Sequence, residues 1–183
     1  MAAVDKNTLL NNLENQVEKH LQLVIHTFQN LPAATLLQPS VTNGWSIAQC
    51  LQHLNAYGHY YLPAIENGLT KNPGKPDTAT FTSTWLGRYF THTMDPATNR
   101  KKYKAFKAYN PPPNLDAYAV VAEFIQQQEA LLSYLKKSRT ADLNVIKIPV
   151  SIASWLKLRL GDVLQFVIAH NQRHLLQAQR NLA

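Results

Sequence analysis

The stretch LGDVLQFVIAHNQRHLLQ, from Leu160 to Gln177, has the spacing of a helix that faces a protein core. Its inner positions recur every three or four residues, which is the period of one face of an α-helix. The stripe consists of Val163, Val167, His170, His174 and Ala178. We therefore predict a helix over residues 160–181 that carries two imidazoles where leucines are expected.

Three further segments have the same apolar period and also predict amphipathic helices. Their stripes run from Leu10 to Leu31, from Ile47 to Ile65 and from Ala117 to Leu135. Ser46 and Gln49 have the spacing of a capping box at the start of the second helix. Pro63 is expected to kink or shorten that helix, and Asn114 is expected to cap the third.

The segments between these stripes are less regular. Residues 70–84 are rich in turn formers and are expected to form a loop, whereas Trp85 to His92 is expected to form a short helix. Residues 138–156 have no clear period, although Val145 to Pro149 could be extended.

Four amphipathic helices without strand alternation indicate an all-α fold, a four-helix bundle in which residues 1–183 form a single domain. The connection between the second and third helices spans about 45 residues, which is far longer than an antiparallel hairpin loop requires. A connection of this length allows helices two and three to run parallel.

The composition is that of a folded globular protein, with 45% hydrophobic and 16% charged residues. No apolar run approaches the roughly 18 residues that a membrane span requires. The N-terminus lacks the basic start and apolar centre of a signal peptide, and the single cysteine, Cys50, excludes an intrachain disulfide framework. We therefore expect a cytoplasmic protein without a membrane partner, in which Cys50 is a small core residue.

The net charge of +7 raises the question of an anionic partner. Much of the excess lies between Arg100 and Lys107, in the sequence RKKYKAFK. A solvated basic loop explains this segment better than a nucleic-acid patch, since no helix-turn-helix, zinc-finger or RNA-recognition motif accompanies it. Nucleic acid is therefore not the expected partner.

His170 and His174 are four residues apart, so their side chains project side by side from the apolar face of the last helix. A buried imidazole without a partner costs about 1–3 kcal/mol, whereas a divalent metal ion would satisfy both rings at once. On spacing alone, metal ligands and satisfied core histidines are equally good interpretations.

A catalytic zinc site takes a third protein ligand, and His53, at the edge of the apolar face of the second helix, is the best candidate. His20 is the second candidate, although a place in the pocket wall or the core suits it better. No glutamate lies between His170 and His174, so the H-E-x-x-H motif of zinc proteases is absent. No nucleophile elbow indicates serine chemistry.

The pattern GWSIAQCLQHL, from Gly44 to Leu54, followed by an H-x-x-x-H near the C-terminus, resembles the DinB-like superfamily, also called DinB/YfiT-like metalloenzymes. The matching markers are Trp45-Ser46 at the start of the second helix, His53 seven residues later, and the C-terminal histidine pair. The number of helices, the long connection and the chain length agree as well, so the resemblance covers most of the chain.

The resemblance implies a divalent metal ion, zinc or nickel, bound by three histidines in a four-helix bundle. Matched by position, the ligands are His53, His170 and His174, with an open place for water or substrate. Arg173 and Gln177 match residues often found beside the second metal-binding stretch of the family, which implies a place in the pocket or behind the ligands.

Two functions of different classes follow. Family members of known chemistry act on low-molecular-weight thiols, so the resemblance implies a metal-dependent thiol S-transferase or small hydrolase with a small-molecule substrate. No carboxylate is expected on the inner stripes near the histidines, which favours thiol activation, and Tyr57 could bond the substrate or be a core-edge tyrosine. The alternative is a non-catalytic metal-binding or stress-related interaction bundle, which could form a homodimer.

Overall fold

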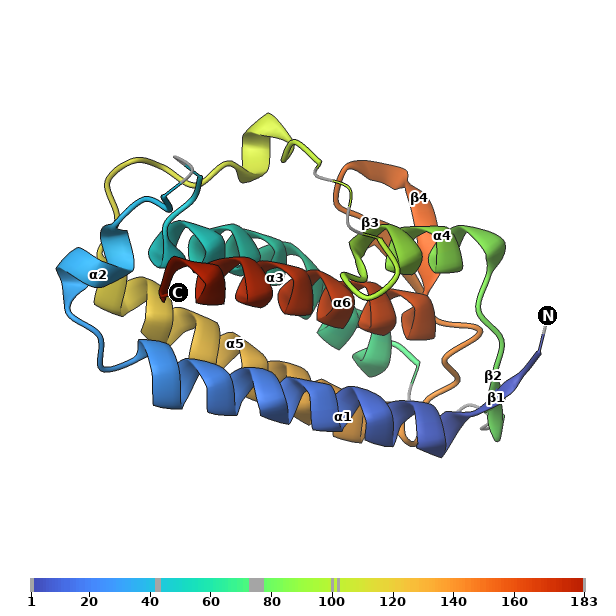
Figure 1. Cartoon of the computed structure of the whole chain (residues 1–183). Coiled ribbons are helices and arrows are strands. Elements are labelled where there is room, and N and C mark those ends of the chain that lie inside the picture. The colour runs from blue at the N-terminus through green and yellow to red at the C-terminus, as the bar shows by residue number, and fades with distance from the viewer. Residues whose placement is uncertain (1, 42–43, 73–77, 100, 102, 183) are drawn as a thin grey trace.

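Four long helices form a bundle, as the sequence predicts (Figure 1). They are α1 (Lys6–Leu23), which a π-helical segment (Val24–Phe28) continues, α3 (Ile47–Thr70), α5 (Ala117–Ser138) and α6 (Leu160–Gln179). The computed structural model describes residues 2–41, 44–72, 78–99, 101 and 103–182. The predicted all-α four-helix bundle is confirmed, with two short strand pairs added to it.

The long helices pack so that each contacts two neighbours. α3 lies against α5 and α6, and α1 lies against the same two helices. α1 and α6 run in one direction, whereas α3 and α5 run in the other (Figure 1). The second and third predicted helices, α3 and α5, are therefore parallel, as the length of their connection allows.

Shorter elements occupy the connections. α4 (Trp85–Met94) confirms the short helix predicted after residue 84, and β3 (Lys147–Val150) confirms the extended piece. The others are α2 (Ala33–Leu37), the antiparallel pair β1 (Val4–Asp5) and β2 (Thr80–Phe81), β4 (Ala153–Arg159), which pairs with β3, and a 3-10 turn (Lys107–Tyr109). Residues 73–77 of the predicted loop lie outside the described residues.

α4 is fixed against α6 by the buried Asp162, in the first turn of α6. Its carboxylate accepts hydrogen bonds from the Thr84 amide at 3.2 Å, the Thr84 hydroxyl at 2.8 Å and the Ser83 hydroxyl. The Thr84 hydroxyl also caps α4, since it accepts from the amide of Gly87 at 2.9 Å. These contacts place the connection that follows α4 beside α6.

Of the two predicted helix caps, the one at the start of α3 is confirmed and the one at the start of α5 is wrong. Ser46 Oγ accepts from the Gln49 amide at 3.1 Å, and the Ser46 amide donates to Gln49 Oε1 at 3.0 Å, which is the predicted capping box. Asn114 does not cap α5; Asp116 does, by accepting from two amides of the first turn. An N-cap directly precedes the first helical residue, and α5 begins at Ala117, so Asp116 and not Asn114 holds that position.

Pro63 does not shorten α3, which continues to Thr70, so the expected shortening is wrong. A proline inside a helix removes one backbone hydrogen bond and costs about 3 kcal/mol. Tyr61 and Ile65, on either side of it, are 1% and 0% exposed. Burial of each such side chain contributes about 1.5–3 kcal/mol, which is enough to offset the cost of the proline.

The core consists of two apolar clusters, one toward each end of the bundle. On α3, one cluster ends at Leu54 and the other begins at Tyr57; on α6, one ends at Ile168 and the other begins at Leu175. The level between the clusters holds the buried polar side chains His20, His53, Gln128, His170 and Asn171. Within the described ranges, no helix is long and apolar enough to cross a membrane.

Candidate metal centre

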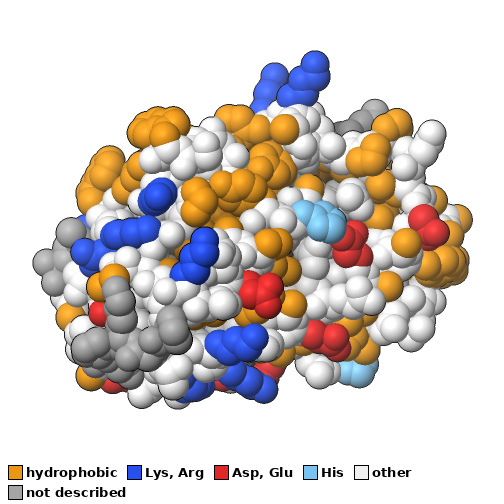
Figure 2. Space-filling model, turned by 180° about the vertical axis from the view of Figure 1, so that it is seen from behind, with side chains coloured by type: hydrophobic (Ala, Val, Ile, Leu, Met, Phe, Trp, Pro, Cys, Tyr) orange, Lys and Arg blue, Asp and Glu red, His pale blue; other side chains and the backbone are white. Residues whose placement is uncertain are grey.

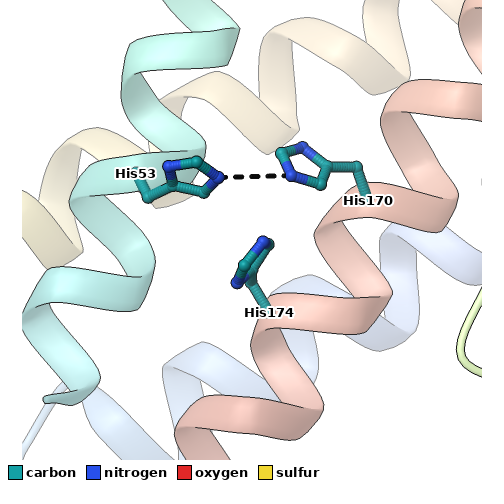
Figure 3. A group of neighbouring side chains, drawn as sticks. All are labelled: His53, His170 and His174. Atoms are coloured by element: carbon teal, nitrogen blue, oxygen red, sulfur yellow. Dashed lines mark hydrogen bonds between the residues drawn. The ribbon is translucent and has the colours of Figure 1, made fainter. Parts of the chain in front are cut away.

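Three histidine side chains meet at this polar level, between α3 and α6 (Figure 3). His53 projects from α3, and His170 and His174 project from adjacent turns of α6. One ring nitrogen of each lies within 4.8 Å of the others, and Nε2 of His53 lies 3.3 Å from Nε2 of His170. His53 and His170 are 2% and 4% exposed, whereas His174 is half-buried. The fold therefore brings together the three histidines that the sequence singles out.

The outer ring nitrogens of two of these histidines face oxygen acceptors. Nδ1 of His53 donates to the backbone carbonyl of Tyr109 at 2.7 Å, and Nδ1 of His174 donates to Oε1 of Gln177 at 3.0 Å. Since a carbonyl oxygen only accepts, each Nδ1 carries the proton and each Nε2 carries a lone pair. Hydrogen bonds of this kind fix the tautomer and ring orientation of a metal-binding imidazole.

Burial lowers the pKa of all three imidazoles. The pKa of His170 lies well below its ordinary value because burial is joined by the charges of the neighbouring histidines and of Arg173. Burial, followed by the charge of His53, lowers the pKa of His174 to about 3. Burial also lowers the pKa of His53, against the opposing effect of its bond to Tyr109. The three rings are therefore neutral at pH 7, which is the form that binds a metal.

Aromatic rings form the walls around the histidines. The ring of Tyr57 lies 5.1 Å from that of His53 and 4.5 Å from that of His170, measured between centroids. The ring of Trp45 lies 4.8 Å from His53 and 5.8 Å from His174. Burial raises the pKa of Tyr57, so its phenol is protonated at neutral pH. Walls of this kind exclude water and strengthen the electrostatic interactions inside the site.

Within the described part of the chain, no carboxylate charge acts on the three histidines. Among the described residues, the charges that shift their pKa values come from histidines and Arg173. Three neutral imidazoles would leave the charge of a divalent cation uncompensated. Zinc and nickel both accept imidazole nitrogen, so the donor set fits either ion.

Arg173 lies beside the ligands in sequence but directs its guanidinium to the connection after α4. That group lies over the ring of Tyr103, 5.6 Å from its centroid. It donates to the backbone carbonyls of Thr93, Met94, Asn99 and Lys101. The structure thus places Arg173 as an anchor of the connection, while its charge also contributes to the lowered pKa of His170 and His174.

His20 lies at the same polar level, but its ring is bonded to an amide side chain. Nε2 of His20 is 2.8 Å from Oε1 of Gln172 on α6, and its buried Nδ1 has no hydrogen-bond partner among the described residues. Gln128 on α5 accepts from the side-chain amide of Asn171 at 3.1 Å. Burial lowers the pKa of His20 to about 4. The structure therefore places His20 in the core, outside the group of three.

The remaining histidines and the cysteine do not join the group. His26 and His59 are exposed, as is His92 on α4. Cys50 is buried on α3, and burial raises the pKa of its thiol to about 12. A thiol with that pKa is a core side chain and not a nucleophile at neutral pH.

The basic segment at residues 100–107 is surface chain where it is described. Lys101, Lys104 and Lys107 are exposed, whereas Arg100 and Lys102 lie outside the described residues. On the face seen in Figure 2, basic side chains are scattered among apolar and acidic ones. That nucleic acid is not a partner stays a prediction.

Sequence reasoning missed the contribution of Tyr109. Its bonding atom is a backbone carbonyl, which every residue has, so no residue type could indicate this role. Only its position gave a signal, since it lies in the long connection just before the three prolines of residues 111–113.

The fold and the site together define a class of protein, a four-helix bundle with three convergent histidines between two of its helices. The sequence profile of the DinB superfamily matches residues 16–178, and the chain belongs to that superfamily. No curated protein matches the sequence.

Among solved structures, the chain is similar to YfiT from Bacillus subtilis, described as a probable metal-dependent hydrolase with an unusual four-helix bundle topology. The match has 13% sequence identity and a TM-score of 0.54, and it covers 95% of this chain and 83% of YfiT. At this identity the likeness is one of fold.

Proposed function

We propose that His53, His170 and His174 bind one divalent metal ion, either zinc or nickel. The observation that carries the proposal is the convergence of three neutral imidazoles within 4.8 Å, two of them with Nδ1 bonded to an oxygen acceptor. Those bonds direct the lone pair of each ring away from the acceptor and toward the other histidines. A histidine that only fills the core does not need this arrangement.

Three protein ligands leave a tetrahedral ion with one free place, which is typical of a catalytic site. His174 is the least buried ligand, so a small-molecule substrate can approach on its side. A bound divalent ion would stabilise a thiolate over a thiol, or a hydroxide over water. The chain itself orients the ligand rings through Tyr109 and Gln177 and limits water through Trp45 and Tyr57.

The site supports a thiol S-transferase best. A low-molecular-weight thiol would bind as the thiolate after its proton leaves to solvent, and its sulfur would displace a leaving group from an electrophilic substrate. The absence of a carboxylate among the charges that act on the histidines, within the described residues, favours this reaction, because a thiolate needs no general base. Metal-dependent hydrolysis is the second candidate, favoured by the description of the structurally similar YfiT.

The first test is the metal content of untagged protein after exposure to zinc or nickel, measured by elemental analysis. About one ion per chain is expected in the wild type, and none in His174→Ala. His26→Ala is the matched control, since His26 is an exposed histidine outside the group. Loss of metal in neither variant, or no metal in any sample, would overturn the proposed site.

The second test separates the enzyme classes with the metal-loaded protein. Thiol-dependent consumption of an electrophile such as an activated aryl halide would indicate S-transfer. Cleavage of an activated ester without any thiol would indicate a hydrolase. Stoichiometric metal without either reaction would support the alternative, a non-catalytic metal-binding or stress-related interaction bundle.

A further inference from the structure

The connection between α4 and α5 reaches the candidate metal centre through Tyr109. Its carbonyl accepts the Nδ1 proton of His53 at 2.7 Å. Its ring lies 4.2 Å from the ring of Tyr57, which in turn lies 4.5 Å from the ring of His170. Tyr109 thus contacts one ligand directly and approaches a second through Tyr57.

The turn that carries Tyr109 depends on that residue for its place. Residues 106–108 are exposed, and the backbone bonds from Tyr109 to Phe106 and from Asn110 to Lys107 are local to the turn. In the described part of the chain, the hydrogen bonds that tie this turn to the body of the protein are those of Tyr109. Besides the bond to His53, its hydroxyl donates to the carbonyl of Ser151 at 3.5 Å.

We propose that Tyr109 is a positioning residue for the metal site, and that metal binding at His53 and the seating of residues 106–110 stabilise each other. The inference rests on the proposed function. A cation on Nε2 draws electron density from the ring and makes Nδ1–H a stronger donor to the Tyr109 carbonyl. By linkage, the seated turn must raise metal affinity by the same factor by which the metal favours seating. Outer partners of metal-binding histidines typically change metal affinity by about 10- to 100-fold.

Limited trypsin digestion tests this coupling, because Lys104 and Lys107 are exposed cleavage sites beside Tyr109. Cleavage in the turn requires local opening, so its rate follows the population of the open turn. In the wild type, zinc is expected to slow cleavage after Lys107 by about 10- to 100-fold. Fragments are assigned by mass spectrometry, and metal content is measured in the same samples. His174→Ala with the same zinc controls for an effect on trypsin and should be cleaved at an unchanged rate.

Two substitutions at Tyr109 separate positioning from simple packing. Tyr109→Ala removes the ring that seats the carbonyl, and we expect about 10-fold weaker zinc binding and loss of protection. Tyr109→Phe keeps the ring and the carbonyl and loses only the 3.5 Å hydroxyl bond to Ser151, so it should retain most of the zinc affinity and of the protection. A merely structural role would lower the melting temperature of metal-free Tyr109→Ala without changing its zinc affinity.

If Tyr109→Ala fails to fold, the cleavage rates of the wild type with and without zinc still test the coupling. Equal cleavage rates with and without stoichiometric zinc would overturn the coupling and leave the proposed metal site intact. Failure of the wild type to hold either zinc or nickel would overturn both.

Discussion

Two parts of the same polar level place neutral imidazoles in the apolar interior, and they do so differently. On one side, His20 of α1 bonds the side-chain oxygen of Gln172. On the other, His53 of α3 and the two histidines of α6 turn ring nitrogens toward one another. Burial lowers the pKa in both places, so burial and pKa alone do not identify a ligand. What distinguishes the two is the partner that each ring nitrogen meets.

A histidine on an apolar stripe can be interpreted from the partners of its two ring nitrogens. His20 donates from Nε2 to the side-chain oxygen of Gln172, and its buried Nδ1 has no hydrogen-bond partner among the described residues. Imidazoles that donate outward to Tyr109 and Gln177 and face one another inward are arranged for a cation. Substitutions in the two places should therefore change metal binding and stability differently.

The largest effect is expected from a matched pair of substitutions. His170→Leu should reduce bound metal from about one ion per chain to background, because it removes one of three ligands. His20→Leu should leave the metal content unchanged, since His20 lies outside the group. Elemental analysis after metal exposure and desalting measures both. If His20→Leu also lost the metal, the distinction between the two regions would fail.

The second prediction concerns the bond from His174 to Gln177. Gln177→Leu removes the acceptor of the Nδ1 proton and should weaken metal binding by about 10- to 100-fold. Gln177→Glu keeps an oxygen acceptor of the same length and should bind at least as tightly as the wild type. Competition with a chromophoric chelator gives the affinities. Equal affinities of the Leu and Glu variants would show that Gln177 does not orient the ligand.

The third prediction compares the free energy of unfolding of two metal-free variants, which should differ in the direction of the change. His20→Leu leaves the half-buried side-chain oxygen of Gln172 without its 2.8 Å partner, so the free energy of unfolding should fall by about 1–3 kcal/mol. His170→Leu places an apolar side chain on an apolar stripe and should be at least as stable as the wild type, because a buried polar group is removed. Urea titrations in the presence of a chelator measure both. A loss of the same size in His170→Leu would mean that the cluster stabilises the fold.

The smallest effect is expected for the share of a single histidine, His20, in the dependence of stability on pH. Burial lowers the pKa of His20 to about 4 and that of His174 to about 3, from 6.5 in the unfolded chain. Below pH 6.5 the unfolded state therefore binds more protons, and the free energy of unfolding falls as pH drops toward these folded values. Each such histidine contributes up to about 1.4 kcal/mol per pH unit.

Urea titrations of the metal-free protein between about pH 7.5 and pH 5 check this dependence. The slope should be shallower in His20→Leu than in the wild type, because one of the contributing histidines is removed. A slope identical to that of the wild type would contradict the assignment of part of it to His20.

Much of the fold could be predicted because its signals are local. The helical stripes depend only on spacing, and the Ser46 capping box depends only on residues three apart. The errors have a different origin. Pro63 stays inside α3 because Tyr61 and Ile65 are buried against other elements, so packing outweighed a local preference. Asp116 replaces Asn114 as the cap because α5 begins at Ala117, and the apolar period alone does not define a helix end to the residue.

The candidate site also has one part that the sequence predicts and another part that depends on packing. Spacing on one helix is sufficient to place His170 and His174 side by side, because four residues make about one turn. That His53 completes the group, whereas His20 bonds Gln172, depends on how α1 and α3 pack against α6. The outer partners are equally inaccessible to sequence reasoning when, as with Tyr109, the acceptor is a backbone carbonyl.

The sequence alone predicts four amphipathic helices and an imidazole pair in an apolar stripe, because these follow from the period of the α-helix. It also predicts the long second connection, which is the gap between two such stripes. Tertiary packing sets which further histidine meets that pair and where Arg173 directs its guanidinium. It also brings the connection between α4 and α5 over α3, where the Tyr109 carbonyl bonds His53. The physical reason is that side-chain partners across helices are set by packing, which local propensities do not encode.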